Sequence, residues 1–177
     1  ISGCKSHDVL VGFGWRARPF LQQVLEAAPP RAPWRPRLVR ILAELGDPVA
    51  APTFRQALRD RTDEVRGYAI YGLHRLGDRS EHEEIIRFAR RAGPFASACA
   101  RLSARWILFA DGERDFGPLF VEELRIRASQ SLASVPVAWG LHLCGLAGSP
   151  DCEPVLALAS RHPTFVVRRA ALDLLER

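Results

Sequence analysis

The chain has 177 residues, of which 47% are apolar and 25% are charged; this composition excludes a disordered protein and is sufficient for a folded core. No stretch of about 18 uncharged apolar residues occurs, so the sequence predicts no transmembrane helix. The formal net charge is +5, and residues 1–92 carry this excess with sixteen basic and eleven acidic side chains. We therefore expect any anionic partner to bind the first half of the chain.

The cysteines give little indication of a metal or cofactor. They are Cys4, Cys99, Cys144 and Cys152. They show neither a CxxC pair nor the spacing of zinc ligands, and we predict no metal and no cofactor. Cys144 and Cys152 are eight residues apart, a separation at which they could meet across a helix–turn–helix.

The first four residues, Ile1-Ser2-Gly3-Cys4, resemble a bacterial lipobox. This resemblance would imply a lipid-anchored envelope protein whose signal peptide is absent from the chain. Mature lipoproteins usually continue in a polar linker, whereas the apolar run Val9–Phe13 follows here almost at once. A cytoplasmic location is therefore the favoured expectation, with the lipid anchor as the alternative.

An apolar pattern with steps of three or four residues, closed by a Gly/Asp turn, recurs along the chain. In Val65–Asp78, the apolar residues Val65, Ala69, Leu73 and Leu76 share one helix face, and Gly77 ends the helix. The other copies are Trp34–Asp47, Ala98–Asp111, Val135–Gly148 and a last copy that begins at Val167. Successive copies are 31, 33, 37 and 32 residues apart, which indicates a structural repeat.

A further helix is predicted between successive copies. These helices are Pro48–Arg59, Ser80–Arg91, Pro118–Arg127 and Pro154–Arg161. Ser80 and Glu83 have the spacing of a capping box at the start of the second of them. Before the repeats, Phe20–Ala28 is a predicted helix, and the proline-rich run 29–33 is expected to be an extended connector.

One full copy carries a resemblance to a known family. Its residues are Leu45-Gly46-Asp47-Pro48, Ala57-Leu58-Arg59-Asp60, Asp63-Glu64-Val65-Arg66, Ala69, Leu73 and Leu76-Gly77-Asp78, with a second match at Val167-Arg168, Ala170-Ala171 and Leu174-Leu175. This pattern resembles HEAT-like repeats, especially the short type of phycobilisome-lyase-like proteins. The third and fourth copies depart from it, with Ala110 and Ala147 in place of the glycine.

The repeats and the resemblance together predict an all-α, right-handed α-solenoid of about four to five HEAT-like helical pairs. Residues 34–177 are the expected repeat array, and residues 1–33 are an N-terminal segment with a first helix and the connector, all within one domain. The resemblance also implies that Asp63 and Arg66 cap helix ends and bond between repeats, which is a structural role.

By this resemblance, the second helix of each pair lines a concave surface. Its expected solvent-facing residues, which we predict to bind a partner, are Arg37, Arg40, Tyr68, Tyr71, Arg101 and Arg105. Arginine and tyrosine are enriched in binding hot spots. We therefore predict a non-catalytic scaffold or adaptor that binds a protein partner along this face. The alternative for these residues is that the tyrosines pack against neighbouring helices and the arginines are only solvated.

Nucleic acid is the alternative partner, because arginines neutralise phosphates and tyrosines stack on bases. Some HEAT-like-repeat proteins are DNA glycosylases for alkylated bases, which use concave tryptophans. Here Trp106 and Trp139 align with core positions of the repeat, so we expect them to be packed. A nucleophile elbow, a P-loop and an HExxH motif are all absent, so the sequence favours a protein without catalytic activity.

The end of the chain shows apolar side chains without a visible capping repeat. Leu172 and Leu175 are expected to face water there. This predicts either a homodimer formed through the exposed end or a truncated chain.

Overall fold

The computed structural model describes residues 9, 11–90, 98–130, 134–147 and 152–176. Over these residues the protein is helical and contains no strand, which confirms the all-α prediction. The elements are η1 (Gly14–Ala17), α2 (Arg18–Ala27), α3 (Arg35–Leu45), η2 (Pro48–Ala50), α4 (Ala51–Ala57), α5 (Asp63–Arg75), α6 (His82–Arg90), α7 (Ala98–Ala110), α8 (Phe116–Ala128), α9 (Ser134–Ala147), α10 (Glu153–Ala159) and α11 (Phe165–Leu175). None of the described helices is long and apolar enough to cross a membrane.

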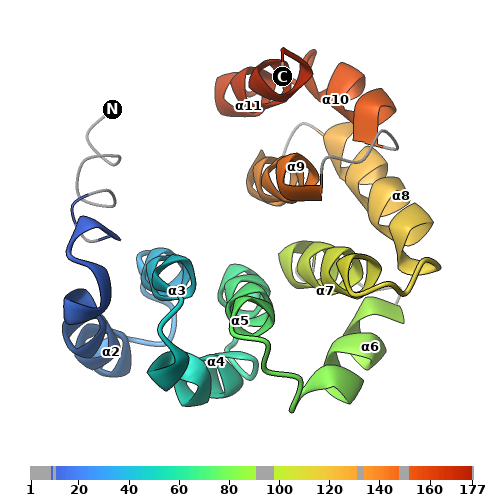
Figure 1. Ribbon diagram of the computed structural model, residues 1–177. Coiled ribbons are helices and arrows are strands. Elements are labelled where there is room, and N and C mark those ends of the chain that lie inside the picture. The colour runs from blue at the N-terminus through green and yellow to red at the C-terminus, as the bar shows by residue number, and fades with distance from the viewer. Residues whose placement is uncertain (1–8, 10, 91–97, 131–133, 148–151, 177) are drawn as a thin grey trace. The chain divides into compact units, whose positions relative to one another are not determined.

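The chain forms two compact units, residues 1–85 and 86–177, and the division falls within α6. In the first unit, α2 packs on α3, and α5 packs on both α3 and α4 (Figure 1). In the second unit, α9 packs on α7 and on α11, while α8 packs on α7, α9 and α10 (Figure 1). The expected boundary between residues 33 and 34 stays a prediction.

Glycine ends two of the long helices in the same way. Gly77 after α5 and Gly112 after α7 have φ angles of +66° and +100°. The amide of Asp78 donates to the carbonyl of Leu73, five residues earlier, and the amide of Glu113 donates to the carbonyl of Leu108, also five residues earlier. This is a Schellman motif, which satisfies carbonyl groups that the helix end leaves free. Alignment with Gly77 places Ala110 at the helix stop of the third copy, but Gly112 performs that role.

Two local expectations differ from the structure. The predicted capping box is wrong, because α6 begins only at His82 and the amide of Ser80 donates instead to Oδ1 of Asp78 at 2.9 Å. The proline-rich run 29–33 is not helical, as predicted, but it is turned rather than extended. The amide of Ala32 donates to the carbonyl of Pro29 at 2.9 Å, which closes a tight turn.

The middle helices are enclosed on more than the one face that their apolar spacing predicts. Every residue of α7 from Ala98 to Leu108 is buried. In α5, buried residues include Ala69, Ile70, Tyr71, Gly72 and Leu73, which cover the full circumference of the helix. Polar side chains on these helices are therefore candidates for internal contacts.

Candidate functional site

The surface part of the predicted contact set lies on α3 and α5. Nε of Arg40 donates to Oε1 of Glu44 at 2.7 Å, one turn later on α3, and Arg40 also bonds to Tyr68 of α5. Burial lowers the pKa of Arg40, but the contacts with Glu44 and Tyr68 outweigh it and raise the pKa. Arg40 and Tyr68 are half-buried, and Arg37, three residues before Arg40 on the same helix face, is exposed.

Tyr71 does not face solvent, so its expected exposure is wrong. Only 6% of the residue is exposed, and the guanidinium of Arg75 lies 6.0 Å from the centre of its ring. This tyrosine corresponds to the packed alternative. Its ring supports a cation–π contact with a residue one turn later on α5.

Arg101 and Arg105 were also expected to face solvent, and this expectation is wrong. Arg101 is 1% exposed and Arg105 is 8% exposed. Both lie on the enclosed part of α7, where a charged side chain requires a partner because its hydration is lost. The partner that they share is Glu123 of α8.

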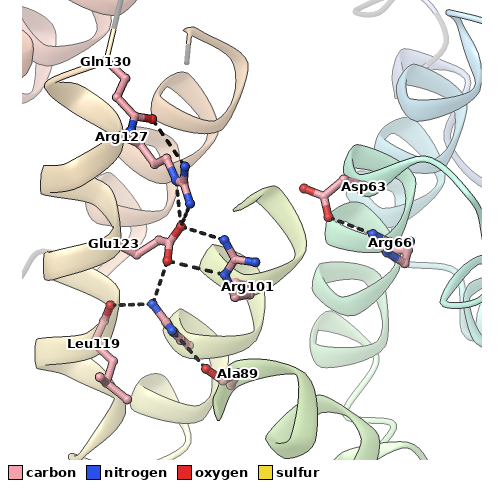
Figure 2. Close-up of polar contacts among 9 residues, drawn as sticks. Asp63, Arg66, Ala89, Arg101, Leu119, Glu123, Arg127 and Gln130 are labelled. Atoms are coloured by element: carbon pink, nitrogen blue, oxygen red, sulfur yellow. Dashed lines mark hydrogen bonds and ion pairs between the residues drawn. The ribbon is translucent and has the colours of Figure 1, made fainter. Parts of the chain in front are cut away.

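Three guanidinium groups converge on the carboxylate of Glu123 (Figure 2). Nη2 of Arg101 lies 3.0 Å from Oε1, Nη1 of Arg105 lies 3.0 Å from Oε2, and Nη2 of Arg127 lies 2.7 Å from Oε1. Arg127 lies four residues after Glu123 on α8, whereas the other two arginines come from α7. We call Arg101, Arg105, Glu123 and Arg127 the α7–α8 charge cluster.

Electrostatics within the α7–α8 charge cluster are dominated by burial and by the shared carboxylate. Burial raises the pKa of Glu123, but hydrogen bonds from Arg101 and Arg127 outweigh it, and the net pKa is lowered. Burial lowers the pKa of Arg105, and repulsion from Arg101 and Arg127 adds to this against the attraction of Glu123.

Arg105 also fixes backbone around the cluster. Its Nε donates to the carbonyl of Ala89 at 2.9 Å, and its Nη1 donates to the carbonyl of Leu119 at 3.0 Å. Ala89 belongs to α6 and Leu119 to α8, so one side chain holds three successive helices of the chain. These contacts give Arg105 a structural role.

The sequence contains a signal for the cluster that the residue spacing on α7 alone does not show. On α8, Glu123 lies three residues after Phe120, and Arg127 lies three residues after Leu124, and both apolar residues are buried. Opposite charges four residues apart within an apolar helix face indicate a buried pair.

A polar contact recurs at the Leu-Gly-Asp turns of the first unit. Oδ1 of Asp47 accepts from the amide of Val49 at 3.0 Å, and Asp47 forms an ion pair with Arg18 of α2. Asp78, 31 residues later, accepts from the amide of Ser80 and pairs with Arg55 of α4 at 2.8 Å. In both copies, the aspartate closes the turn after a repeat helix and pairs with an arginine of the helix before that one, α2 in the first copy and α4 in the second.

A second recurring contact holds the loop that precedes a repeat helix. An arginine near the start of α3, α5 and α11 donates to carbonyl groups that precede its helix: Arg35 to Leu25, in the last turn of α2, and to Ala28, Arg66 to Asp60, and Arg168 to His162. We call these three residues the loop-clamping arginines.

The residues whose carbonyls Arg66 and Arg168 bind, Asp60 and His162, also close their own loops with a side-chain hydrogen bond. Oδ1 of Asp60 accepts from the amide of Thr62 at 2.8 Å, and Nδ1 of His162 accepts from the amide of Thr164 at 3.1 Å. Asp60 also accepts from Nη2 of Arg35 at 2.6 Å, which joins the start of α3 to the loop before α5.

Asp63 and Arg66 form an ion pair at 3.2 Å within the first turn of α5 (Figure 2). Nη1 of Arg66 also donates to the carbonyl of Asp60, in the loop before α5, at 3.1 Å. The helix-capping role that the resemblance implies for the two residues stays a prediction. The pair of Arg35, on α3, and Asp60, in the loop before α5, is one contact between successive repeats.

Trp106 and Trp139 are buried, as predicted, with 6% and 4% of each residue exposed. Nε1 of Trp139 donates to Oγ of Ser103 on α7 at 2.7 Å, and its ring stacks on His142 with the ring centres 5.1 Å apart. Neither tryptophan is presented to a base. Leu172 and Leu175 are exposed, as expected, and the homodimer stays a prediction.

The first unit also contains a cleft that the sequence did not indicate. It has a volume of about 350 Å³ and is open to solvent. Its lining residues are Leu25, Glu26, Pro30, Arg35, Thr53, Gln56, Ala57, Arg59, Asp60 and Arg61. None of the six predicted contact residues lines it.

Over the described ranges, no three histidine, cysteine, aspartate or glutamate side chains are grouped closely enough to hold a metal ion. Comparisons of the chain with protein-family models, with curated proteins and with solved structures each find no significant match.

Proposed function

We propose that this protein is a HEAT-like helical-repeat scaffold that binds a protein partner without catalysis, along the concave face of a right-handed α-solenoid. The contact residues of the proposal are Arg37, Arg40 and Tyr68 of the first unit. Arg101, Arg105 and Tyr71 are buried and are therefore left out of the contact set. The expected partner surface is acidic, because the first half of the chain carries the positive excess.

The repeated polar contacts support the repeat architecture. Asp47 and Asp78 lie 31 residues apart, and each makes the same turn contact and pairs with an arginine, while the three loop-clamping arginines occupy the same position in three copies of the sequence repeat. In the second unit, α9 contacts α7 and α11, and α8 contacts α10. Contacts between alternate helices are what stacked helical pairs produce.

The observation that carries the binding proposal is the contact between Arg40 and Tyr68. It places a guanidinium from α3 beside a phenol from α5 at the surface, with Glu44 holding the arginine in position. Arg37 adds an exposed cation on the same helix face. A pre-ordered arginine loses less side-chain entropy on binding, and Arg and Tyr are frequent hot-spot residues.

The test compares the wild-type protein with Arg37→Glu and Tyr68→Ala as immobilised baits for cell extract, followed by measurement of Kd with the purified captured protein. Each substitution should weaken binding at least about tenfold, as expected for hot-spot residues. Arg16→Glu is the matched control, because it changes the net charge equally at an exposed position of the same unit. Equal weakening by the control, or unchanged binding by both site variants, contradicts the proposed site.

Nucleic acid remains the second candidate because the first unit exposes many cations, among them Arg16, Arg31, Arg37, Arg59 and Arg61. Fluorescence anisotropy with a labelled random duplex and a single strand, at two salt concentrations, separates the candidates. Phosphate neutralisation predicts affinity that falls steeply with salt. A protein scaffold predicts no binding even at low salt.

A further inference from the structure

Two buried thiols of the second unit lie in direct contact. Sγ of Cys144, on α9, lies 2.7 Å from Sγ of Cys152, which immediately precedes α10. Non-bonded sulphur atoms do not ordinarily approach so closely. Each cysteine is 3% exposed, so neither thiol is freely available to a large reagent in the folded protein.

The surrounding residues do not make this pair a metal site. The described part of the chain contains no group of three side chains able to hold a metal ion. The two histidines that are nearest in sequence are engaged elsewhere: His142 stacks on Trp139, and His162 accepts from the amide of Thr164. Two thiols in contact that belong to no such group of ligands among the described residues fit a disulfide rather than zinc.

We propose that Cys144 and Cys152 are a redox pair that forms an intramolecular disulfide and links α9 covalently to the start of α10. The oxidant is a small disulfide such as oxidised glutathione, and the reaction yields one protein disulfide and two molecules of reduced glutathione. No other cysteine is required.

The exchange takes place in two steps. Cys144 donates to Cys152; this bond and burial raise the pKa of the Cys144 thiol. In the first step, the thiolate of Cys152 attacks one sulphur of the glutathione disulfide and expels a glutathione thiolate. Cys144 then gives up its proton, attacks the mixed disulfide at the Cys152 sulphur and expels the second thiolate. Burial predicts that this exchange is slow.

The link would join two helices that both pack on α8 and on α11. α9 packs on α11, and α10 packs on both α8 and α11. A disulfide adds a covalent constraint to this group of helices and removes conformational freedom from the unfolded chain. By thermodynamic linkage, the folded state favours the disulfide by the same factor by which the disulfide stabilises the fold.

The test measures oxidation of the whole wild-type chain in buffers with increasing ratios of oxidised to reduced glutathione. The protein is folded in one series and unfolded by urea in the other. Free thiols are trapped by alkylation, and the chain is cleaved before aspartate, since Asp151 separates Cys144 from Cys152 in the sequence. We expect one pair of linked peptides with the mass of two hydrogens removed. The disulfide should be favoured about 100-fold more in the folded than in the unfolded protein.

Cys144→Ser is the matched variant. Oxidation should raise the Tm of the second unit by roughly 10–20 °C in the wild type, and should leave the Tm of this variant unchanged. The proposal is overturned if both thiols are still alkylated at the glutathione ratio that half-oxidises the unfolded chain. It is also overturned if the linked peptides contain Cys99 or Cys4 instead.

Discussion

Nη2 of Arg101 lies 3.0 Å from Oε1 of Glu123, and this carboxylate is shared with Arg105 and Arg127. Removal of this carboxylate leaves three positively charged guanidinium groups close together without the negative charge that they share. We therefore expect Glu123→Ala to lower the free energy of unfolding of the second unit by about 3–5 kcal/mol. Hydrogen exchange of the amides of α7 and α8 measures the stability of the second unit separately from that of the first.

The neighbouring acid supplies the control for that change. Glu122 pairs with Arg125 at 2.8 Å, but both side chains are more than half exposed. Glu122→Ala should therefore leave the stability nearly unchanged. Similar losses in the two variants would contradict a special role for the α7–α8 charge cluster.

The stability of the second unit should depend on pH through Glu123. Its pKa is lowered in the folded protein, because hydrogen bonds from Arg101 and Arg127 outweigh the opposing effect of burial. Such a carboxyl stabilises the fold fully above its unfolded pKa, near 4.3, and the contribution is lost as the pH falls through the folded pKa. Between about pH 6 and about pH 3, the wild type should thus lose more stability than Glu123→Gln. Parallel pH curves for the two proteins would contradict this assignment.

The two turn aspartates should differ in energy although they make the same contacts. Asp47 is 5% exposed, whereas Asp78 is half-buried and its partner Arg55 is 43% exposed. An asparagine can retain the turn hydrogen bond but loses the charge of the pair. We expect Asp47→Asn to lower the free energy of unfolding by about 2 kcal/mol and Asp78→Asn by less than about 1 kcal/mol. Urea unfolding of both variants checks this order, and a larger loss for Asp78→Asn would reverse it.

Gly72 allows α4 and α5 to approach closely. A Cβ atom on this residue would lie 2.7 Å from Cε1 and Cζ of the Phe54 ring, and Phe54 is fully buried. Gly72→Ala gains helix propensity, but the clash with a rigid ring should outweigh this and give a net loss of about 1–2 kcal/mol.

A double-mutant cycle identifies the cause of that loss. Phe54→Leu removes the clashing edge of the ring, so the double variant should lose less stability than the sum of the two single variants. Losses that simply add would show that Gly72 matters for another reason. Urea unfolding measures all three variants.

The sequence predicted the helices well because their signals are local. The apolar spacing from Val65 to Leu76 and the stop at Gly77 specify α5 almost completely, and the same pattern identifies α3 and α11. The resemblance placed Arg66 at a structural contact, which the bond to Asp60 bears out. At each of these positions, the determining contacts lie within one turn or one loop.

The predicted contact set depended on non-local contacts, and half of its members proved to be internal. On α7, Arg101 and Arg105 have the spacing of a solvated face, and their partner Glu123 lies 22 and 18 residues away on another helix. Tyr71 is enclosed because α5 packs on both α3 and α4. Spacing within one helix indicates which residues share a face, but it does not show how many neighbours enclose that helix.

The loop-clamping arginines have a consequence for how the chain folds. Arg66 lies six residues from the Asp60 carbonyl that it binds, and Arg168 lies six residues from that of His162. Contacts of such short range close only small loops, so they lose little chain entropy and can form on the timescale of the helices themselves. The pair of Arg35 and Asp60 spans 25 residues and must wait for two helices to meet. We expect refolding to begin at these connections, with high φ-values at Arg66 and Arg168 and low ones at Arg35.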